Sequence, residues 1–171
     1  MTFKKSTAIL VATAMIALGA CSKKPPKDLP DPPMGSGGSM GDTGGNGGAF
    51  APGSQEDFIA NTASDRIYFG FDQYNIDTED MATLQSQASW LRRYPATRVM
   101  IEGHADERGT RDYNLALGAR RANAARNYLA SLGVDPARID TISYGKERPA
   151  NPASTEEAYA ANRRAVTVTI R

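Results

Sequence analysis

The fold is decided by residues 99–132, which read VMIEGHADERGTRDYNLALGARRANAARNYLASL. The first three residues, Val99 to Ile101, are apolar and predict a strand. A glycine-bounded loop follows from Gly103 to Gly109. Leucines and small residues then recur at helical spacing, and Gly133 stands just past the expected helix end. The stretch therefore predicts a strand, a loop and a helix that begins near Arg111 to Asn114.

Small residues mark one face of this helix. Gly118, Ala122 and Ala125 recur at helical spacing, so their side chains would share that face. Without bulky side chains there, the helix could lie close to a sheet.

Other strand and helix patterns flank this unit on both sides. We expect strands at 66–71, 139–144 and 165–170, a helix from Asp77 or Thr78 to Tyr94, and a short helix from Thr155 to Asn162. The longer helix would bury one face, made of Met81, Leu84, Ala88 and Leu91. The order βαβαβαβ predicts an α/β (α+β) two-layer sandwich, in which helices cover one face of a small mixed four-stranded sheet. A single domain over residues 56–171 would hold this core.

The N-terminus has the features of an export signal. Residues 1–20 contain Lys4 and Lys5 and then an apolar run that is too short for a spanning helix. The tetrapeptide Leu18-Gly19-Ala20-Cys21 resembles the lipobox of bacterial lipoproteins, in which the cysteine is acylated after cleavage. Ser22 follows where lipoproteins of the inner membrane often carry Asp, so the resemblance favours the outer membrane. The alternative is an ordinary signal peptide with an incidental cysteine.

The span after Cys21 has the composition of a tether. Residues 22–55 hold 9 of the 16 glycines and 6 of the 10 prolines. Such a segment buries too little apolar surface to offset chain entropy, so we expect residues 21–55 to form a lipidated, disordered tether.

Composition limits the partners and cofactors. Lys+Arg at 20 against Asp+Glu at 19 gives a net charge of +1, without the basic excess typical of nucleic-acid binding. One cysteine cannot form an intramolecular disulfide, and one histidine argues against a histidine-rich zinc site. We therefore expect no metal and no cofactor.

Two acids follow the first two predicted strands. Asp72 lies after the first and Asp106 after the second, and loops at the carboxyl ends of parallel strands meet at one edge of a sheet. Arg121 lies one or two turns into the next helix, near the face of Leu117. With Phe71, these residues would form a cleft for one ammonium and one carboxylate joined by an apolar stem, since a guanidinium can bind both carboxylate oxygens.

Other interpretations remain open from spacing. Asp106 and Arg121 could form an ordinary surface ion pair. A periplasmic cell-wall hydrolase or amidase could use His104 as its base, although no nucleophile motif accompanies it. The runs 146–148 and 163–164 are charged and typical of a solvated surface, and we leave Arg164 outside the site.

Ordered motifs between residues 65 and 170 resemble a known family. They are Tyr68-Phe69-Gly70-Phe71-Asp72, Glu102 to Thr110, Tyr113-Asn114, Leu117-Gly118, Arg120 to Ala124, Ser143 to Glu147 and Asn162 to Val166. Together they resemble the OmpA C-terminal-like family.

That resemblance implies a role without catalysis. It implies a lipoprotein of the outer membrane that binds peptidoglycan noncovalently and works with TolB and the other Tol proteins in envelope integrity and cell division. In the family, an aspartate and an arginine 15 residues later hold meso-diaminopimelate of the peptide stem, and these match Asp106 and Arg121. Phe71, Asp72 and Leu117 match the remaining ligand contacts.

Overall fold

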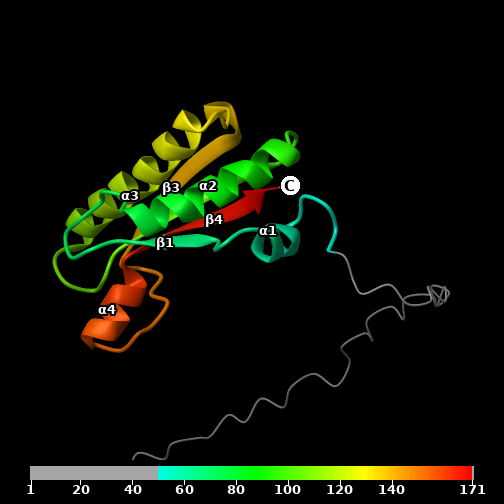
Figure 1. The fold of residues 1–171 in the computed structure, drawn as a ribbon. Coiled ribbons are helices and arrows are strands. Elements are labelled where there is room, and N and C mark those ends of the chain that lie inside the picture. Colours follow the sequence, from blue (N-terminus) through cyan, green and yellow to red (C-terminus); the bar gives the residue numbers. More distant parts are fainter. Residues whose placement is uncertain (1–49, 171) are drawn as a thin grey trace, which may run out of the picture. The chain divides into compact units, whose positions relative to one another are not determined.

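The computed structural model describes residues 50–170, which form a four-stranded sheet with the two long helices packed on one of its faces (Figure 1). The predicted signal segment, Cys21 and most of the glycine-rich and proline-rich span lie outside the described residues. The expected two-layer α/β architecture is confirmed.

The sheet is mixed, as the sequence predicted. Its strands are β1 (Arg66–Tyr68), β2 (Arg98–His104), β3 (Ile139–Gly145) and β4 (Arg164–Ile170), in the order β1-β4-β2-β3. Strand β4 runs antiparallel to both β1 and β2, whereas β3 pairs parallel with β2. Strands β1 and β2 therefore point the same way, and the loops that follow them leave the sheet at the same edge.

The helices begin at the polar residues that the sequence indicated. They are α2 (Thr78–Arg93), α3 (Arg111–Ser131), the 3-10 turn η1 (Pro136–Arg138) and α4 (Glu156–Asn162). The Asp77 side chain accepts from the Asp80 N–H to cap α2, and Thr155 accepts from the Ala158 N–H to cap α4. Among residues 50–170, no helix is both long enough and apolar enough to cross a membrane.

The first helix was not expected from the sequence. Helix α1 (Gln55–Asn61) begins at Ser54, whose side chain accepts from the Asp57 N–H. Phe58 packs edge-on against Trp90 at 4.9 Å between ring centroids, and the Gln55 side chain accepts from the Thr169 N–H of β4 at 2.7 Å. Seven residues are too few to show a helical period, so tertiary contacts hold this helix in place.

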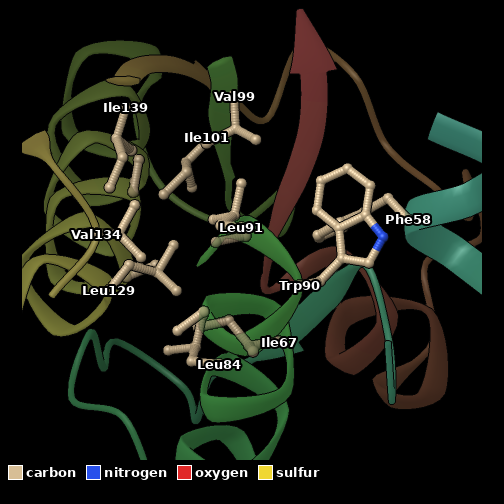
Figure 2. Close-up of a cluster of buried hydrophobic side chains, with 14 of the residues drawn as sticks. Phe58, Ile67, Leu84, Trp90, Leu91, Val99, Ile101, Leu129, Val134 and Ile139 are labelled. Atoms are coloured by element: carbon tan, nitrogen blue, oxygen red, sulfur yellow. The ribbon is translucent and has the colours of Figure 1, made fainter. Parts of the chain in front are cut away.

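The core fills the space between sheet and helices. Figure 2 shows Leu84 and Leu91 of α2, Leu129 of α3, and Val99 and Ile101 of β2 converging there. They belong to one cluster with Phe58, Ile67, Phe69, Ala88, Trp90, Ala122, Ala125, Val134, Ile139 and Ala165.

Two local expectations at β1 and α2 were wrong. Strand β1 ends at Tyr68 instead of reaching Phe71, because the chain turns where the Gln73 N–H donates to the Gly70 carbonyl at 3.2 Å. Met81 was expected on the buried face of α2 but is 36% exposed. It lies in the first helical turn, beside a strand that is only three residues long.

Helix α3 lies directly against β2 at two glycines, as its small residues predicted. A Cβ atom on Gly103 would lie 1.9 Å from the Gly118 carbonyl oxygen, and one on Gly118 would lie 2.3 Å from Ser143 Oγ. Ala122 and Ala125 continue this contact and are buried. The close approach fixes the distance of the helix from the sheet.

The first prediction concerns this contact. Gly103→Ala should lower the free energy of unfolding by about 1–3 kcal/mol or more, because the new methyl group meets backbone atoms that cannot move aside. Urea denaturation followed by circular dichroism measures this loss. Ala116→Ser on the exposed side of α3 is the control and should cost less than about 0.7 kcal/mol. Equal stability of the two variants would contradict the packing argument.

Candidate functional site

A cavity of about 250 Å³ lies where the loops after β1 and β2 meet the first turns of α3. All five residues that the sequence predicted for the cleft line it: Phe71, Asp72, Asp106, Leu117 and Arg121. Arg108, Gly109, Tyr113 and Asn114 complete the lining. The common direction of β1 and β2 brings these two loops together.

Arg121 is a buried cation held by backbone carbonyls. Its side chain donates from Nε to the Gln73 carbonyl at 2.8 Å, from Nη1 to the His104 carbonyl at 2.7 Å and from Nη2 to the Gly70 carbonyl at 3.2 Å. Burial lowers the pKa of Arg121 to about 10, against the opposing field of Asp106. Three of its five N–H groups are thus engaged, and the other two have no acceptor among the described residues.

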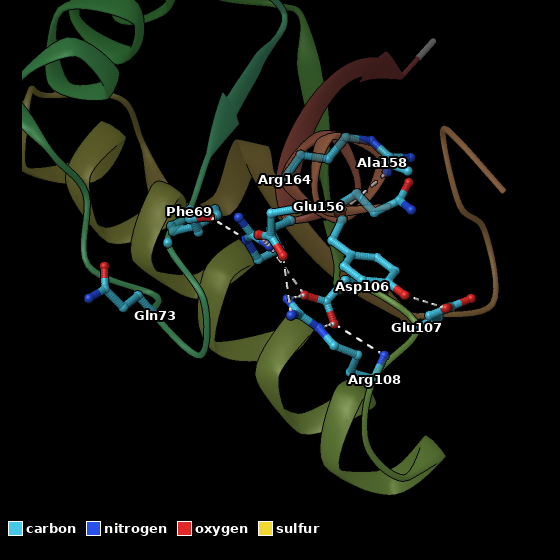
Figure 3. Close-up of polar contacts among 12 residues, drawn as sticks. Phe69, Gln73, Asp106, Glu107, Arg108, Glu156, Ala158 and Arg164 are labelled. Carbon is cyan, nitrogen blue, oxygen red and sulfur yellow. Dashed lines mark hydrogen bonds and ion pairs between the residues drawn. The ribbon is translucent and has the colours of Figure 1, made fainter. Parts of the chain in front are cut away.

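Asp106 pairs with other arginines. Its carboxylate accepts from Arg108 Nη2 at 2.6 Å and lies 3.4 Å from Arg163 Nη1. Burial alone would raise the pKa of Asp106, but the hydrogen bonds from Arg108 outweigh this effect and hold the pKa below its usual range. Figure 3 shows Asp106 facing Arg108, with Glu156 nearby.

The surface ion pair that spacing left open between Asp106 and Arg121 is not formed. No ion pair joins the two residues in the described part of the chain, and Arg121 is 0% exposed. The two side chains line the same cavity as separate charges.

The Arg163 side chain links several groups beside the site. It donates from Nε to the Phe69 carbonyl at 3.0 Å and from Nη1 to Glu156 at 3.0 Å, in addition to its contact with Asp106. The prediction that residues 163–164 form a solvated surface was therefore wrong, because both arginines are 8% exposed. A run of charged residues beside a buried strand has the same composition as a run on the surface. Only the fold shows which of the two it is.

Aromatic side chains lie at the outer side of the cavity and contact its charged residues. Phe71 is 62% exposed, and the Arg108 guanidinium lies 4.5 Å from its ring centroid and 4.4 Å from that of Tyr159. Asp72 adopts a left-handed backbone with φ of 55° and accepts a hydrogen bond from the Tyr113 hydroxyl. These contacts hold the β1 loop over the start of α3.

Four residues that line the cavity were not predicted from the sequence. Arg108 follows Asp106 by two positions on the same loop, and the Asn114 side chain donates to the Arg108 carbonyl at 2.8 Å. Tyr113 reaches Asp72 across the cavity from the first turn of α3. The run of polar residues from Asp106 to Asn114 was a usable signal, but it does not say which side chains turn inward.

His104 does not have the properties of a catalytic base. It does not line the cavity, it is 1% exposed, and both ring nitrogens lack hydrogen-bond partners among the described residues. Burial and the nearby Arg164 and Arg148 lower the pKa of His104 to about 4. Its backbone carbonyl serves the site by holding Arg121.

No three His, Cys, Asp or Glu side chains in the described range lie together in a way that could hold a metal ion. The chemistry of the cavity is that of fixed charges beside an apolar surface. Such a site can bind a ligand that carries both an amine and a carboxylate.

The chain is similar in sequence to known proteins. The OmpA family model matches residues 68–163. A peptidoglycan-associated lipoprotein of Agrobacterium fabrum is 49% identical over 165 residues, covering 96% of this chain and 88% of the relative.

Solved structures have the same fold. The crystal structure of the peptidoglycan-associated lipoprotein from Burkholderia pseudomallei aligns with a TM-score of 0.63 and 40% identity, over 67% of this chain and 100% of that one. The C-terminal domain of Helicobacter pylori MotB aligns with a TM-score of 0.57 and 22% identity, over 63% of this chain and 84% of that one. The second likeness concerns the fold alone.

The second prediction concerns His104. Because the chain has one histidine, its imidazole gives a single set of NMR signals. The Cε1–H chemical shift should titrate near pH 4, since the pKa of His104 is lowered to about 4. The unfolded chain takes up this proton near its ordinary pKa of about 6.5, so stability should fall as pH drops from about 6.5 towards 4. A midpoint near pH 6.5 in the folded protein would contradict the burial argument.

The third prediction concerns Arg163. Arg163→Ala should lower the free energy of unfolding by about 1–3 kcal/mol, because it leaves the buried Phe69 carbonyl without its side-chain donor and removes one of the two arginines at Asp106. The control is Arg98→Ala, which removes a 2.7 Å pair with Asp140 that is about half exposed. That loss should be about 1 kcal/mol or less. Similar losses of stability for Arg163→Ala and Arg98→Ala in thermal or urea unfolding would show that the Arg163 contacts do not stabilise the fold.

Proposed function

We propose that this chain, which belongs to the OmpA family and within it to the peptidoglycan-associated lipoproteins, binds peptidoglycan noncovalently and links it to the outer membrane. The names of the relatives support the ligand and the lipid anchor. The cavity at the edge of the sheet supplies the binding site.

The ligand that fits the charges is the meso-diaminopimelate residue of the peptide stem. Its side chain ends in one amine and one carboxylate, whereas lysine in the same place ends in the amine alone. Arg121 would bind the carboxylate through the two N–H groups that its three carbonyl contacts leave over. This buried arginine, held at the cavity by three carbonyls and bonded to no carboxylate among residues 50–170, is the observation that carries the proposal.

The acids would bind the amine. Asp72 and Asp106 line the same cavity as Arg121, and the low pKa of Asp106 keeps its carboxylate charged. Leu117 and Phe71 offer apolar surface to the methylene stem between the two charged ends. Because guanidinium, carboxylates and apolar surface are fixed before binding, the ligand does not have to order them.

The rest of the role follows from the N-terminus and the family. Acylation of Cys21 would hold the chain in the outer membrane, since each buried methylene adds about 0.8 kcal/mol and several chains together give a lasting anchor. The span 21–55 would let the domain reach the cell wall. The chain would also bind TolB and work with the other Tol proteins. TolB binding would compete with binding to the cell wall.

The fourth prediction changes the ligand and leaves the protein intact. Mature chain carrying Cys21→Ser should co-sediment with diaminopimelate-containing peptidoglycan and bind lysine-containing peptidoglycan about tenfold or more weakly, because Arg121 is then left without its anion. Equal binding to the two walls would contradict the carboxylate argument. Release of soluble muropeptides, lost in His104→Ala, would identify a hydrolase instead.

Variants test the same site from the protein side. Asp72→Asn changes an exposed loop, and Arg121→Lys keeps a cation but cannot make the three fork contacts. Both should weaken co-sedimentation. Circular dichroism and thermal stability should be unchanged in Asp72→Asn, whereas Arg121→Lys should also unfold at a lower temperature, because it leaves buried carbonyls without donors. Asp140→Asn alters a carboxylate on β3, outside the cavity lining, and should bind like the parent protein.

A further inference from the structure

Arg120 differs from the other arginines of α3 in the partners of its N–H groups. It is exposed, and no residue between 50 and 170 forms a hydrogen bond or an ion pair with it. The other three are bonded: Arg111 to Glu147 at 3.2 Å, Arg126 to the Pro136 carbonyl at 3.4 Å, and Arg121 to three carbonyls. The N–H groups of Arg120 are therefore available to a ligand.

Arg120 lies on the face of α3 that lines the cavity. It follows Leu117 by three residues and Tyr113 by seven, both of which line the cavity, and residues at these spacings share one side of a helix. Side chains on a helix lean towards its N-terminus, which is where the cavity lies. Arg120 is consequently at the rim of the cavity.

The charge of Arg120 acts on a residue that lines the cavity. The pKa of Tyr113 is raised, first of all by the hydrogen bond that its hydroxyl donates to Asp72, and the field of Arg120 opposes this rise. The cation is thus close enough to affect the cavity, although it forms no ion pair with Asp72 in the described part of the chain.

The β1 loop contacts only the flat face of Arg120. The guanidinium carbon lies 5.8 Å from the ring centroid of Tyr74, near the limit of about 6 Å for a cation–π contact. Such stacking uses the face of the guanidinium and leaves the N–H groups in its plane free. Arg108 differs in this respect, because it lies over two rings and also donates to Asp106 and Glu156.

The surface between the cavity and Arg120 is aromatic and open to solvent. Phe71, Tyr74 and Tyr113 are 62%, 49% and 46% exposed. Aromatic residues and arginine are enriched at binding surfaces. The binding surface therefore extends beyond the cavity, along α3 to Arg120.

We propose that Arg120 forms a second anion subsite, which binds a carboxylate of the peptide stem other than the one bound at Arg121. This inference rests on the proposed function, because it takes the ligand in the cavity to be one residue of a longer peptide. The planar fork of a guanidinium can bind both oxygens of a carboxylate. Two further carboxylates fit this chemistry: the α-carboxylate of the γ-linked glutamate that precedes diaminopimelate, and the carboxylate at the C-terminus of the stem.

Three synthetic ligands separate these two sources. The first is the tetrapeptide L-alanyl-γ-D-glutamyl-meso-diaminopimelyl-D-alanine. The second carries a carboxamide in place of the glutamate α-carboxylate, and the third carries a carboxamide at its C-terminus. Isothermal titration calorimetry measures the affinity of each ligand for the mature Cys21→Ser chain with and without Arg120→Gln.

Arg98→Gln is the matched control. It removes the same charge from the chain, but Arg98 begins β2, whereas the loop of the cavity follows the end of that strand. Seven strand residues place the two about 20 Å apart. This variant should bind all three ligands as the Cys21→Ser chain does.

Arg120→Gln should bind the tetrapeptide about fivefold more weakly, as expected for the loss of a solvent-exposed ion pair. The loss should shrink as NaCl is raised from about 50 mM to about 500 mM. One of the two carboxamide ligands should bind the Cys21→Ser chain with the same weakened affinity, and Arg120→Gln should not weaken it further. That ligand identifies the carboxylate at Arg120.

Two results would overturn the inference while leaving the proposed function in place. One is equal affinity of Arg120→Gln and Arg98→Gln for the tetrapeptide. The other is a loss in Arg120→Gln that is the same size with both carboxamide ligands as with the tetrapeptide. If the Cys21→Ser chain itself bound none of the three ligands, the proposed function would be wrong and this inference with it.

Discussion

Three hydrogen bonds from one buried guanidinium hold the binding region together. Arg121 joins the Gly70 and Gln73 carbonyls of the β1 loop to the His104 carbonyl at the end of β2. Burying a cation is costly, and the lowered pKa of Arg121 reflects that cost. The three carbonyls and the nearby carboxylates offset it. The loops that form the cavity are thus fixed around a charge that a ligand can use.

The scaffold determines where that charge lies. The glycine contact between Gly103 and Gly118 sets the height of α3 above β2, and Leu117 and Arg121 are placed by the same helix. From the other side, Arg163 at the start of β4 ties the Phe69 carbonyl to Asp106. The sheet, α3 and the two arginines all contact the same two loops, so several interactions together determine the geometry of the site.

Asp106 and Asp80 show how the environment gives similar residues different properties. Asp106 and Asp80 are both largely buried, and burial raises the pKa of each carboxyl group. Arg108 and Arg163 stand against Asp106, so its pKa falls below the usual range. Asp80 has acids as neighbours instead, and its pKa rises to about 6. The sign of the neighbouring charges therefore decides in which direction the pKa of each buried carboxyl group moves.

The sequence by itself determined the order of the strands and of the helices that follow β1, a start of α2 at Asp77 or Thr78, a start of α4 at Thr155, and the five residues expected in the cleft. These depend on local periodicity and on the rule that loops after strands of common direction meet at one edge. Tertiary structure alone decided that Asp106 pairs with Arg108 and Arg163, that Arg121 is held by carbonyls, and that α1 forms. Those outcomes depend on contacts between residues far apart in the chain, such as Arg163 with Phe69, whose partners and burial no local pattern encodes.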